Sequence, residues 1–256
     1  MLLSAHRAVA RIAALLAIVS VTACSDSPLS PLSPASADFA RGGGGKPPKP
    51  PKPTPIHDPI LFIHGYNGNS TTWSTMVSRF KADGWTSAEL VNWSYNYRQS
   101  NATTAQQIQQ KVDSILAATG ATKVDIITHS MGPLSARYYV RYIEDGKVDA
   151  LVSLGGANHG TNTASLCFDV SCVEMRPGST YLNNLNSIDE TWGTPRYATW
   201  WSPCDGVINP QTSALLDGAT NTQTACISHS ALHEDAGVYQ QVRDMVNVPR
   251  LLATAQ

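Results

Sequence analysis

The chain has 256 residues, a formal net charge of -1, 14% charged residues and 42% apolar residues. This length predicts one main domain, and a charge so close to zero excludes the strongly basic proteins that gather nucleic-acid phosphates. The five cysteines and seven histidines are few enough to be placed one by one.

Residues 1–24 have the features of an export signal. Arg7 and Arg11 supply positive charge, and the apolar residues 12–21 form a run that is too short to span a membrane. The run ends at Val21-Thr22-Ala23-Cys24, which resembles a bacterial lipobox, where the cysteine is lipidated and becomes the new N-terminus. We expect Cys24 to be lipidated, since the other four cysteines can form two disulfides and leave it unpaired. Ordinary cleavage at a nearby small residue is the alternative.

Residues 25–55 are expected to be a disordered tether. They are rich in serine and proline first, then contain a run of glycines, and end in a repeat of lysine and proline. Such a segment has little apolar surface to bury, and its proline-rich part favours an extended polyproline II spacer. Together with the signal, it predicts either a membrane-anchored lipoprotein or a secreted protein of a bacterium. A pro-region is the alternative interpretation.

Residues 56–256 alternate between predicted strands and predicted helices. The apolar run at residues 59–63 predicts a buried strand, and residues 104–119 predict an amphipathic helix. Further strands are predicted at residues 88–93, 123–128, 148–154, 196–201 and 222–228, and further helices at residues 70–84, 131–144 and 237–246. This order predicts an α/β domain with a mainly parallel sheet and helices on both faces. Residues 158–195 are polar and weakly periodic, which favours a lid, a binding loop or short helices.

Ser130 stands between a predicted strand and a predicted helix. The sequence there, Thr128-His129-Ser130-Met131-Gly132, is a variant of the nucleophile elbow G-x-S-x-G. In this elbow a tight turn projects a serine hydroxyl above the sheet. Thr128 replaces the first glycine, and Gly132 is retained. A serine that merely caps a helix is the alternative.

Three sequence blocks resemble a known family. They are residues 63–68, 121–132 and 151–158. They resemble the class 2 lipases, small bacterial enzymes of the α/β-hydrolase superfamily typified by the Bacillus secreted lipase, over most of residues 58–247. The resemblance implies a minimal α/β-hydrolase fold and the cleavage of carboxylic esters. The Bacillus enzymes have alanine where Thr128 stands and glycine where Pro133 stands, so the two elbows are related but not identical.

A serine nucleophile needs a base and an acid that orients the base. In this fold the chain order is serine, acid, histidine, which leaves Asp189, Asp205 and Asp217 as candidate acids. Asp205 lies in a loop directly after the predicted strand at residues 196–201, the place that the family's acid occupies. We therefore expect Asp205 to be the acid; a turn residue is the alternative.

Two histidines, His229 and His233, follow the last predicted strand and are candidates for the base. The family's histidine falls nine residues before a valine, and His229 stands nine residues before Val238. His233 is followed by two acidic residues and is expected to be solvated at the start of the last helix. We therefore expect His229 to be the base.

The oxyanion hole is expected to consist of two backbone N–H groups, because such donors are rigid and cannot lose their proton. One comes from the residue after the nucleophile, Met131. By resemblance the other comes from Tyr66, in the loop after the first strand of the domain. His64 and His159 precede the acid in the chain and are expected to be structural.

The cysteines bear on the same site. Cys204 precedes Asp205, and Cys226 lies three residues before His229, so a bridge between them would join the acid loop to the base loop. Cys167 and Cys172 would then close a small local loop. Four cysteines allow three pairings, and we predict Cys204–Cys226 with Cys167–Cys172 because this pairing would hold the loop of Asp205 to the loop of His229.

These residues predict acyl transfer by a triacylglycerol lipase or carboxylesterase through an acyl-enzyme. The expected partner is an ester or lipid substrate, and no metal or organic cofactor is implied because no motif for one occurs. A polyester depolymerase or a thioesterase on the same scaffold is an alternative, as is a non-catalytic surface lipoprotein that binds a glycan or lipid. The six tryptophans are expected either to line an apolar cleft or to pack in the core; they are Trp73, Trp85, Trp93, Trp192, Trp200 and Trp201.

Overall fold

A single parallel sheet forms the centre of the domain. The structure is a computed structural model that describes residues 56–247. The sheet has six strands in the order β2-β1-β3-β4-β5-β6, and every neighbouring pair is parallel. The strands are β1 (Ile60–Ile63), β2 (Leu90–Trp93), β3 (Val124–His129), β4 (Val148–Leu154), β5 (Arg196–Trp201) and β6 (Thr220–Gln223). The expectations for residues 1–24 and 25–55, including Cys24, lie outside the described residues.

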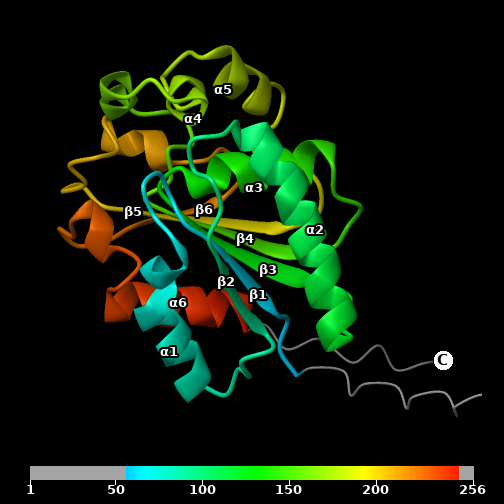
Figure 1. Ribbon diagram of the computed structural model, residues 1–256. Helices are drawn as coiled ribbons and strands as arrows, with labels where there is room; N and C mark the ends of the chain where they lie inside the picture. The colour runs from blue at the N-terminus through cyan, green and yellow to red at the C-terminus, as the bar shows by residue number, and fades with distance from the viewer. Residues whose placement is uncertain (1–55, 248–256) are drawn as a thin grey trace, which may run out of the picture. The chain divides into compact units, whose positions relative to one another are not determined.

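Helices cover both faces of this sheet (Figure 1). The helices α1 (Ser74–Ala82) and α6 (Ala236–Val246) lie on one face, and α2 (Asn101–Thr119) and α3 (Gly132–Tyr142) lie on the other. The α/β-hydrolase arrangement expected from the sequence is therefore confirmed. No helix within residues 56–247 is both long and apolar enough to cross a membrane.

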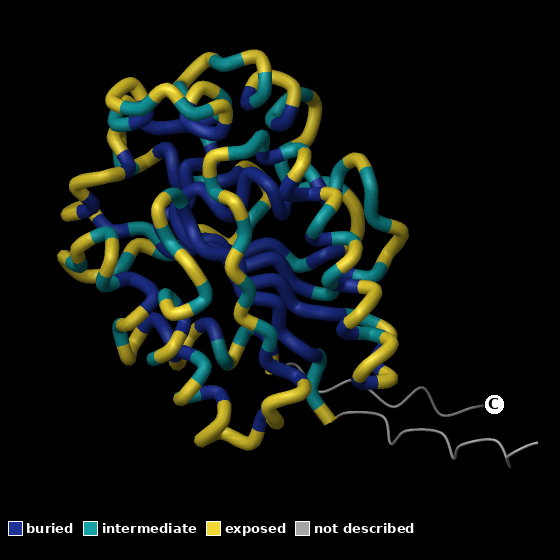
Figure 2. The backbone as a smooth tube through the Cα atoms, viewed as in Figure 1, coloured by how far each residue is buried: buried dark blue, intermediate teal, exposed yellow. Residues whose placement is uncertain are grey.

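Strand β1 shows how the two faces share one sheet. All four of its residues are fully buried, as its continuous apolar run predicts. Ile60 and Phe62 pack into the core beneath α1 and α6, while Leu61 and Ile63 pack into the core beneath α2 and α3. Successive side chains of a strand point to opposite faces, so a strand between two helical layers must be apolar throughout. Figure 2 shows the same central strands as the most deeply buried part of the chain.

Helix α2 begins three residues earlier than predicted. Its start is fixed by Ser100, whose side chain accepts a hydrogen bond from the N–H of Ala102. The carboxylate of Glu174 adds an acceptor for the N–H of Asn101, at 2.7 Å. This second cap comes from a residue far away in the sequence, so the local pattern could not indicate it.

The last strand is shorter and earlier than predicted. β6 ends at Gln223, whereas the sequence pattern placed the strand over residues 222–228. Beyond Gln223 the chain leaves the sheet: the N–H of Thr224 donates to Trp201, and the N–H of Ile227 donates to the hydroxyl of Ser202. The disulfide at Cys226 holds the segment in this irregular path, which apolar patterning does not encode.

Residues 158–195 contain short helices instead of one long loop. These are α4 (Val170–Glu174), α5 (Thr180–Leu185) and a 3₁₀ helix at Asn162–Leu166. Three further 3₁₀ helices lie at Ser70–Trp73, Gln211–Ala214 and His229–Ala231. In Figure 1, α4 and α5 lie beyond the carboxyl ends of the strands. This is the edge where α/β sheets place their binding sites.

Candidate active site

Ser130 occupies a strained turn between β3 and α3. Its φ angle is +60°, a conformation that non-glycine residues rarely adopt and that clusters at functional sites. The turn is held from both sides, because the N–H of Ser130 donates to Leu154 and its carbonyl accepts from Ala157. A Cβ atom at Gly65 would lie 2.5 Å from the Cβ of Ser130, so the loop after β1 can pass the serine only with a glycine there.

The two departures from the Bacillus elbow fit this turn. Thr128 is fully buried, and its hydroxyl donates to the carbonyl of Val152 at 2.7 Å, so the extra polar group has a partner. Pro133 lies in the first turn of α3, where a backbone N–H has no partner in the helix. Neither substitution leaves an unpaired polar group.

Asp205 and His229 form a close pair. The Nδ1 of His229 lies 2.7 Å from the Oδ2 of Asp205, whose side chain is only 2% exposed. The other carboxylate oxygen of Asp205 accepts hydrogen bonds from the N–H groups of Val207 and Ile208, at 2.8 and 2.9 Å. Three donors thus fix the carboxylate, and through it the imidazole ring. This is how an acid sets the orientation and tautomer of a histidine base.

His233 is not a solvated residue, so that expectation is wrong. Its side chain is buried, and its ring packs against Trp73 at 5.7 Å and against His129 at 4.7 Å. The two acidic neighbours suggested exposure, and Glu234 is exposed, but the side chain of His233 is buried among aromatic rings. Burial lowers the pKa of His233, which keeps the ring neutral.

His129 is a site residue that the sequence did not reveal. Its Nε2 lies 3.0 Å from the carbonyl oxygen of His229, and the two rings lie 4.5 Å apart. Burial, with the nearby His229 and His233, holds the pKa of His129 well below its usual range. A neutral ring can donate this hydrogen bond without placing a second positive charge beside His229.

One cavity joins these groups. Its volume is about 430 Å³, and Gly65, Tyr66, Ser130, Leu166, Val207 and His229 are among the residues that line it. The backbone N–H groups of Tyr66 and Met131 have no acceptor among the described residues. None of the six tryptophans lines this cavity: Trp73, Trp85 and Trp200 are buried in the core beneath α1 and α6, in line with the core-packing interpretation.

Two disulfides hold the loops around the candidate site. Cys204 bonds to Cys226, across a separation of 22 residues, and joins the loop of Asp205 to the segment that leads to His229. Cys167 bonds to Cys172, across 5 residues, and Cys167 itself lines the cavity. The phenol of Tyr66 donates to Asp169, inside the Cys167–Cys172 loop, at 2.6 Å. The loop after β1 and this disulfide loop therefore meet over the cavity.

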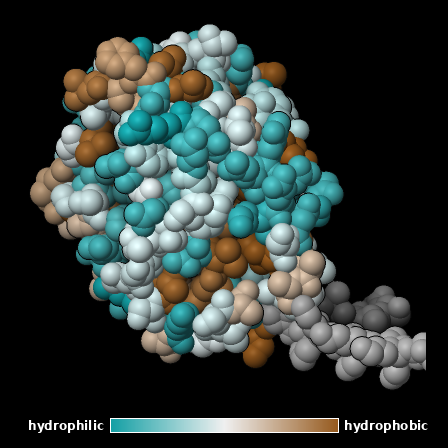
Figure 3. All heavy atoms as spheres, viewed as in Figure 1, coloured by the Kyte–Doolittle hydropathy of each residue, from teal (hydrophilic) through white to brown (hydrophobic). Residues whose placement is uncertain are grey.

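The disulfide loop exposes apolar side chains. Leu166 is 82% exposed and Phe168 is 87% exposed, and Val170 and Val173 are also exposed. Figure 3 shows apolar residues gathered at the upper left of the molecule, the part where Figure 1 places α4. Exposed aliphatic and aromatic side chains at a cavity rim are typical of binding surfaces for apolar partners.

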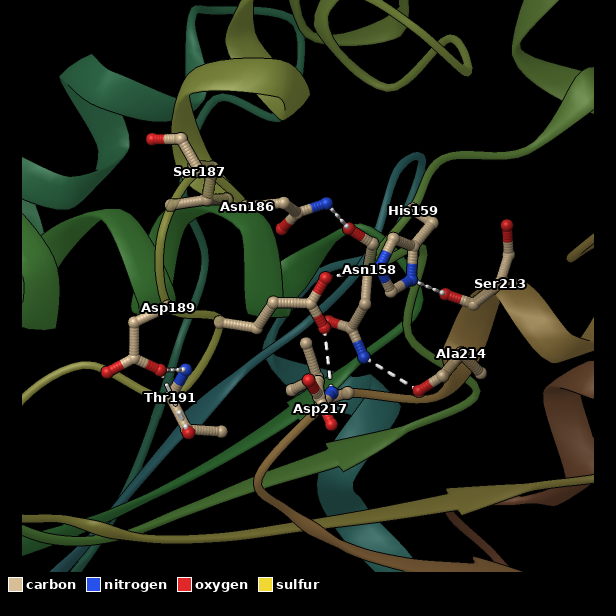
Figure 4. Close-up of polar contacts among 12 residues, drawn as sticks. Asn158, His159, Asn186, Ser187, Asp189, Thr191, Ser213, Ala214 and Asp217 are labelled. Atoms are coloured by element: carbon tan, nitrogen blue, oxygen red, sulfur yellow. Dashed lines mark hydrogen bonds and ion pairs between the residues drawn. The ribbon is translucent and has the colours of Figure 1, made fainter.

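His64 and His159, which were expected to be structural, contact groups outside the Ser130 turn and the Asp205–His229 pair. His64 is buried, and its Nδ1 lies 2.8 Å from the carbonyl of Gly65 in the loop after β1. The Nε2 of His159 lies 2.6 Å from Glu190, and its Nδ1 faces the carbonyl of Ser213. Figure 4 shows His159 in a polar network that connects three separate segments of the chain. The hydrogen bond that the ring donates to Glu190 raises the pKa of His159.

The other two candidate acids belong to that network and do not line the cavity. Asp189 accepts from the N–H of Thr191 in a local turn, and the N–H of Asp217 donates to Glu190 (Figure 4). Asp205 is therefore the one of the three candidates that the structure brings to a histidine at the cavity.

The parallel sheet, its helical layers and the serine turn define an α/β-hydrolase. Residues 57–248 match the model of the class 2 lipase family, and the chain belongs to this family. It is 30% identical over 113 residues to a triacylglycerol lipase of Vibrio cholerae, which covers 42% of this chain and 35% of that protein. It is 38% identical over 65 residues to a triacylglycerol lipase of Pseudarthrobacter phenanthrenivorans, which covers 25% of this chain and 20% of that protein. The chain thus spans about a third or less of the length of the curated relatives it matches.

Among solved structures, the mature form of the Bacillus licheniformis lipase BlEst2 superposes with a TM-score of 0.67 at 16% identity. That alignment covers 77% of this chain and 94% of the other. Aspergillus fumigatus lipase B superposes with a TM-score of 0.65 at 15% identity, over 75% of this chain and 53% of the other. At such identities the likeness shows a shared fold.

Proposed function

We propose that the protein is a serine ester hydrolase of the triacylglycerol lipase or carboxylesterase type. One observation carries the proposal. His229 is held by Asp205 at 2.7 Å, and it opens into the same cavity as Ser130, which sits in a strained turn. The family and the names of the relatives support an ester or lipid as the substrate.

In the proposed mechanism Ser130 attacks the ester carbonyl while the Nε2 of His229 takes its proton. Asp205 holds the opposite side of the imidazole ring and stabilises the charged form. The proton then passes from His229 to the leaving alcohol, which leaves an acyl-enzyme on Ser130. Water, deprotonated by His229, releases the acid and restores the serine.

The oxyanion is proposed to bind the backbone N–H groups of Met131 and Tyr66. Tyr66 lines the cavity in the loop after β1, and Met131 directly follows the cavity-lining Ser130 at the start of α3. The contact between the phenol of Tyr66 and Asp169 steadies this loop from outside. Loss of one such donor costs about 10²–10³-fold in kcat.

The test replaces Ser130 with alanine and measures hydrolysis of a p-nitrophenyl ester. We expect kcat/KM to fall at least about 10³-fold, because the nucleophile is lost while binding groups remain. Ser230→Ala is the matched control, since Ser230 lines the same cavity and has no proposed role in the reaction. A fluorophosphonate probe should label the unaltered protein and Ser230→Ala but not Ser130→Ala. Near-normal activity of Ser130→Ala would refute the assignment.

Within ester hydrolases, the exposed apolar rim favours a lipid substrate. Leu166 lines the cavity and is 82% exposed, and Phe168, two residues further on, is 87% exposed on the Cys167–Cys172 loop, so an apolar acyl chain would gain by contact with them. The measurement is a rate profile over p-nitrophenyl esters of increasing chain length. We expect long-chain esters to be favoured, and Phe168→Ser to shift the preference towards short chains. A profile that peaks at acetate in both proteins would contradict the lipase assignment.

We also propose export, with an anchor at Cys24. The two disulfides support an oxidising compartment, because such bonds persist outside the cytoplasm. Export and lipidation rest on the sequence of residues 1–24. Detergent partitioning, with Cys24→Ala as the comparison, tests the anchor: the altered protein should move to the aqueous phase. Equal partitioning of both proteins would refute the lipid anchor and indicate a secreted protein without one.

A further inference from the structure

Three carboxylates meet at the edge of the sheet opposite to the candidate active site. Asp58 lies two residues before β1, Asp125 is the second residue of β3, and Asp149 is the second residue of β4. These strands are neighbours, so their amino ends bring the three side chains together. One oxygen from each side chain lies within 4.8 Å of the others.

Asp125 is the unusual member of this group. It is fully buried, and neither of its carboxylate oxygens has a hydrogen-bond partner among the described residues. The backbone N–H of Ala150 is near enough to lower its pKa slightly but makes no well-formed hydrogen bond. A buried charge without a partner costs several kcal/mol in general, so this carboxylate needs something to neutralise it.

The nearby cationic side chains form ion pairs with Asp149 and not with Asp125. The guanidinium of Arg196 lies 2.7 Å from one oxygen of Asp149, and the ammonium of Lys123 lies 3.6 Å from the other. The contact with Lys123 is loose and partly exposed, so another cation can share that oxygen. Both charges also mean that a bound cation meets some repulsion, which limits its affinity.

We propose that Asp58, Asp125 and Asp149 bind one calcium ion. The donors are all carboxylate oxygens, which hard cations prefer and which zinc and copper sites rarely use alone. Two oxygens on one calcium ion are at most about 5 Å apart, since each bond is about 2.3–2.6 Å, and the separation of these three groups fits that limit. Magnesium gives up its waters reluctantly and is less suited to a site lined by a buried carboxylate.

The ion would act on stability and not on the reaction. Asp125 and Ser130 are five residues apart on β3 and its turn, which corresponds to about 16 Å along an extended chain. A cation shared by β1, β3 and β4 would tie together the three central strands at their starting ends. The proposal is therefore independent of the proposed function, and either can fail without the other.

The expected affinity is modest. Three carboxylates, one already paired with two cationic side chains, resemble extracellular calcium sites with Kd of about 10⁻⁴–10⁻³ M. At about 10 mM calcium such a site is mostly occupied and should raise Tm by about 3–11 °C for a domain of this size. Burial and the neighbouring carboxylates of Asp58 and Asp149 raise the pKa of Asp125, so a proton competes with the cation for this carboxylate.

The experiment compares melting curves of the full chain at about pH 8, after removal of metals with EDTA. Calcium chloride at about 10 mM is compared with sodium chloride at equal ionic strength and with magnesium chloride. Equilibrium dialysis with radioactive calcium gives the stoichiometry, expected to be one ion per chain. Asp125→Asn should abolish both the Tm shift and the binding, whereas Asp113→Asn, which changes an exposed carboxylate elsewhere, should preserve both.

Asp58→Asn provides a second variant in case Asp125→Asn does not fold, and it should weaken calcium binding at least about tenfold. The proposal is overturned by a Tm in calcium equal to that in matched sodium chloride, which would mean that a proton alone neutralises Asp125. It is also overturned by calcium binding that survives both Asp125→Asn and Asp58→Asn, since the ion would then sit elsewhere.

Discussion

Removal of the Cys204–Cys226 disulfide should cost both stability and catalysis. The bridge closes a separation of 22 residues, and the chain-entropy model gives it about 3.4 kcal/mol at 25 °C. The double variant Cys204→Ala/Cys226→Ala should therefore unfold in urea with a free energy lower by roughly 3 kcal/mol. It should also lower kcat, because the bridge joins the loop of Asp205 to the loop of His229.

The second disulfide is the internal comparison. Cys167–Cys172 closes a separation of only 5 residues, which the same model values at about 2.1 kcal/mol. Because this loop borders the cavity without touching Asp205 or His229, Cys167→Ala/Cys172→Ala should raise KM more than it lowers kcat. Urea unfolding and ester hydrolysis of both double variants provide the measurements. The reasoning is refuted if the Cys167/Cys172 variant loses more stability than the Cys204/Cys226 variant, or if kcat falls equally in both.

Two further changes probe the elbow and the polar network. Gly65→Ala would place a Cβ atom 2.5 Å from the Cβ atom of Ser130, so kcat/KM for ester hydrolysis should fall about 10²-fold. Gly206→Ala is the control: its new Cβ atom meets open space, so esterase activity should stay near normal. Equal activities of the two variants would contradict the close-packing argument. Glu190 raises the pKa of His159, so their pair stabilises the fold fully below the ordinary histidine pKa and loses this contribution as pH rises through the raised value. Glu190→Gln should thus lose more stability near pH 6 than near pH 9 in urea unfolding, and an NMR titration should show the pKa of His159 returning downwards.

The strands that carry the site were predictable because each is buried on both faces. β1 is a continuous apolar run and β3 and β4 are mostly apolar, and short runs of this kind between predicted helices are typical of buried parallel strands. Parallel strands place their carboxyl ends at one edge, so the turn at Ser130 and the loop at Asp205 had to meet there. Order along the chain and this geometry suffice to choose among the acidic residues.

The features that the sequence missed depend on contacts between distant segments. The start of α2 is set by Glu174, and the path after β6 is set by hydrogen bonds to Ser202 and Trp201. His233 has acidic neighbours in the chain but aromatic neighbours in space. A local sequence pattern shows only the neighbours in the chain, so it predicted a solvated environment for His233, which is wrong.

His129 shows how such a contact can matter for chemistry. A base in acyl transfer must alternate between neutral and charged forms without moving, and Asp205 secures only the Nδ1 side of the ring of His229. The hydrogen bond from His129 secures the backbone of the same residue, at 3.0 Å. Because burial lowers the pKa of His129 and keeps the ring neutral, it fixes His229 without opposing the positive charge that the proposed mechanism places there. The residue that precedes the serine in the elbow thus links the strained turn to the loop of the base, two segments that are a hundred residues apart in the chain.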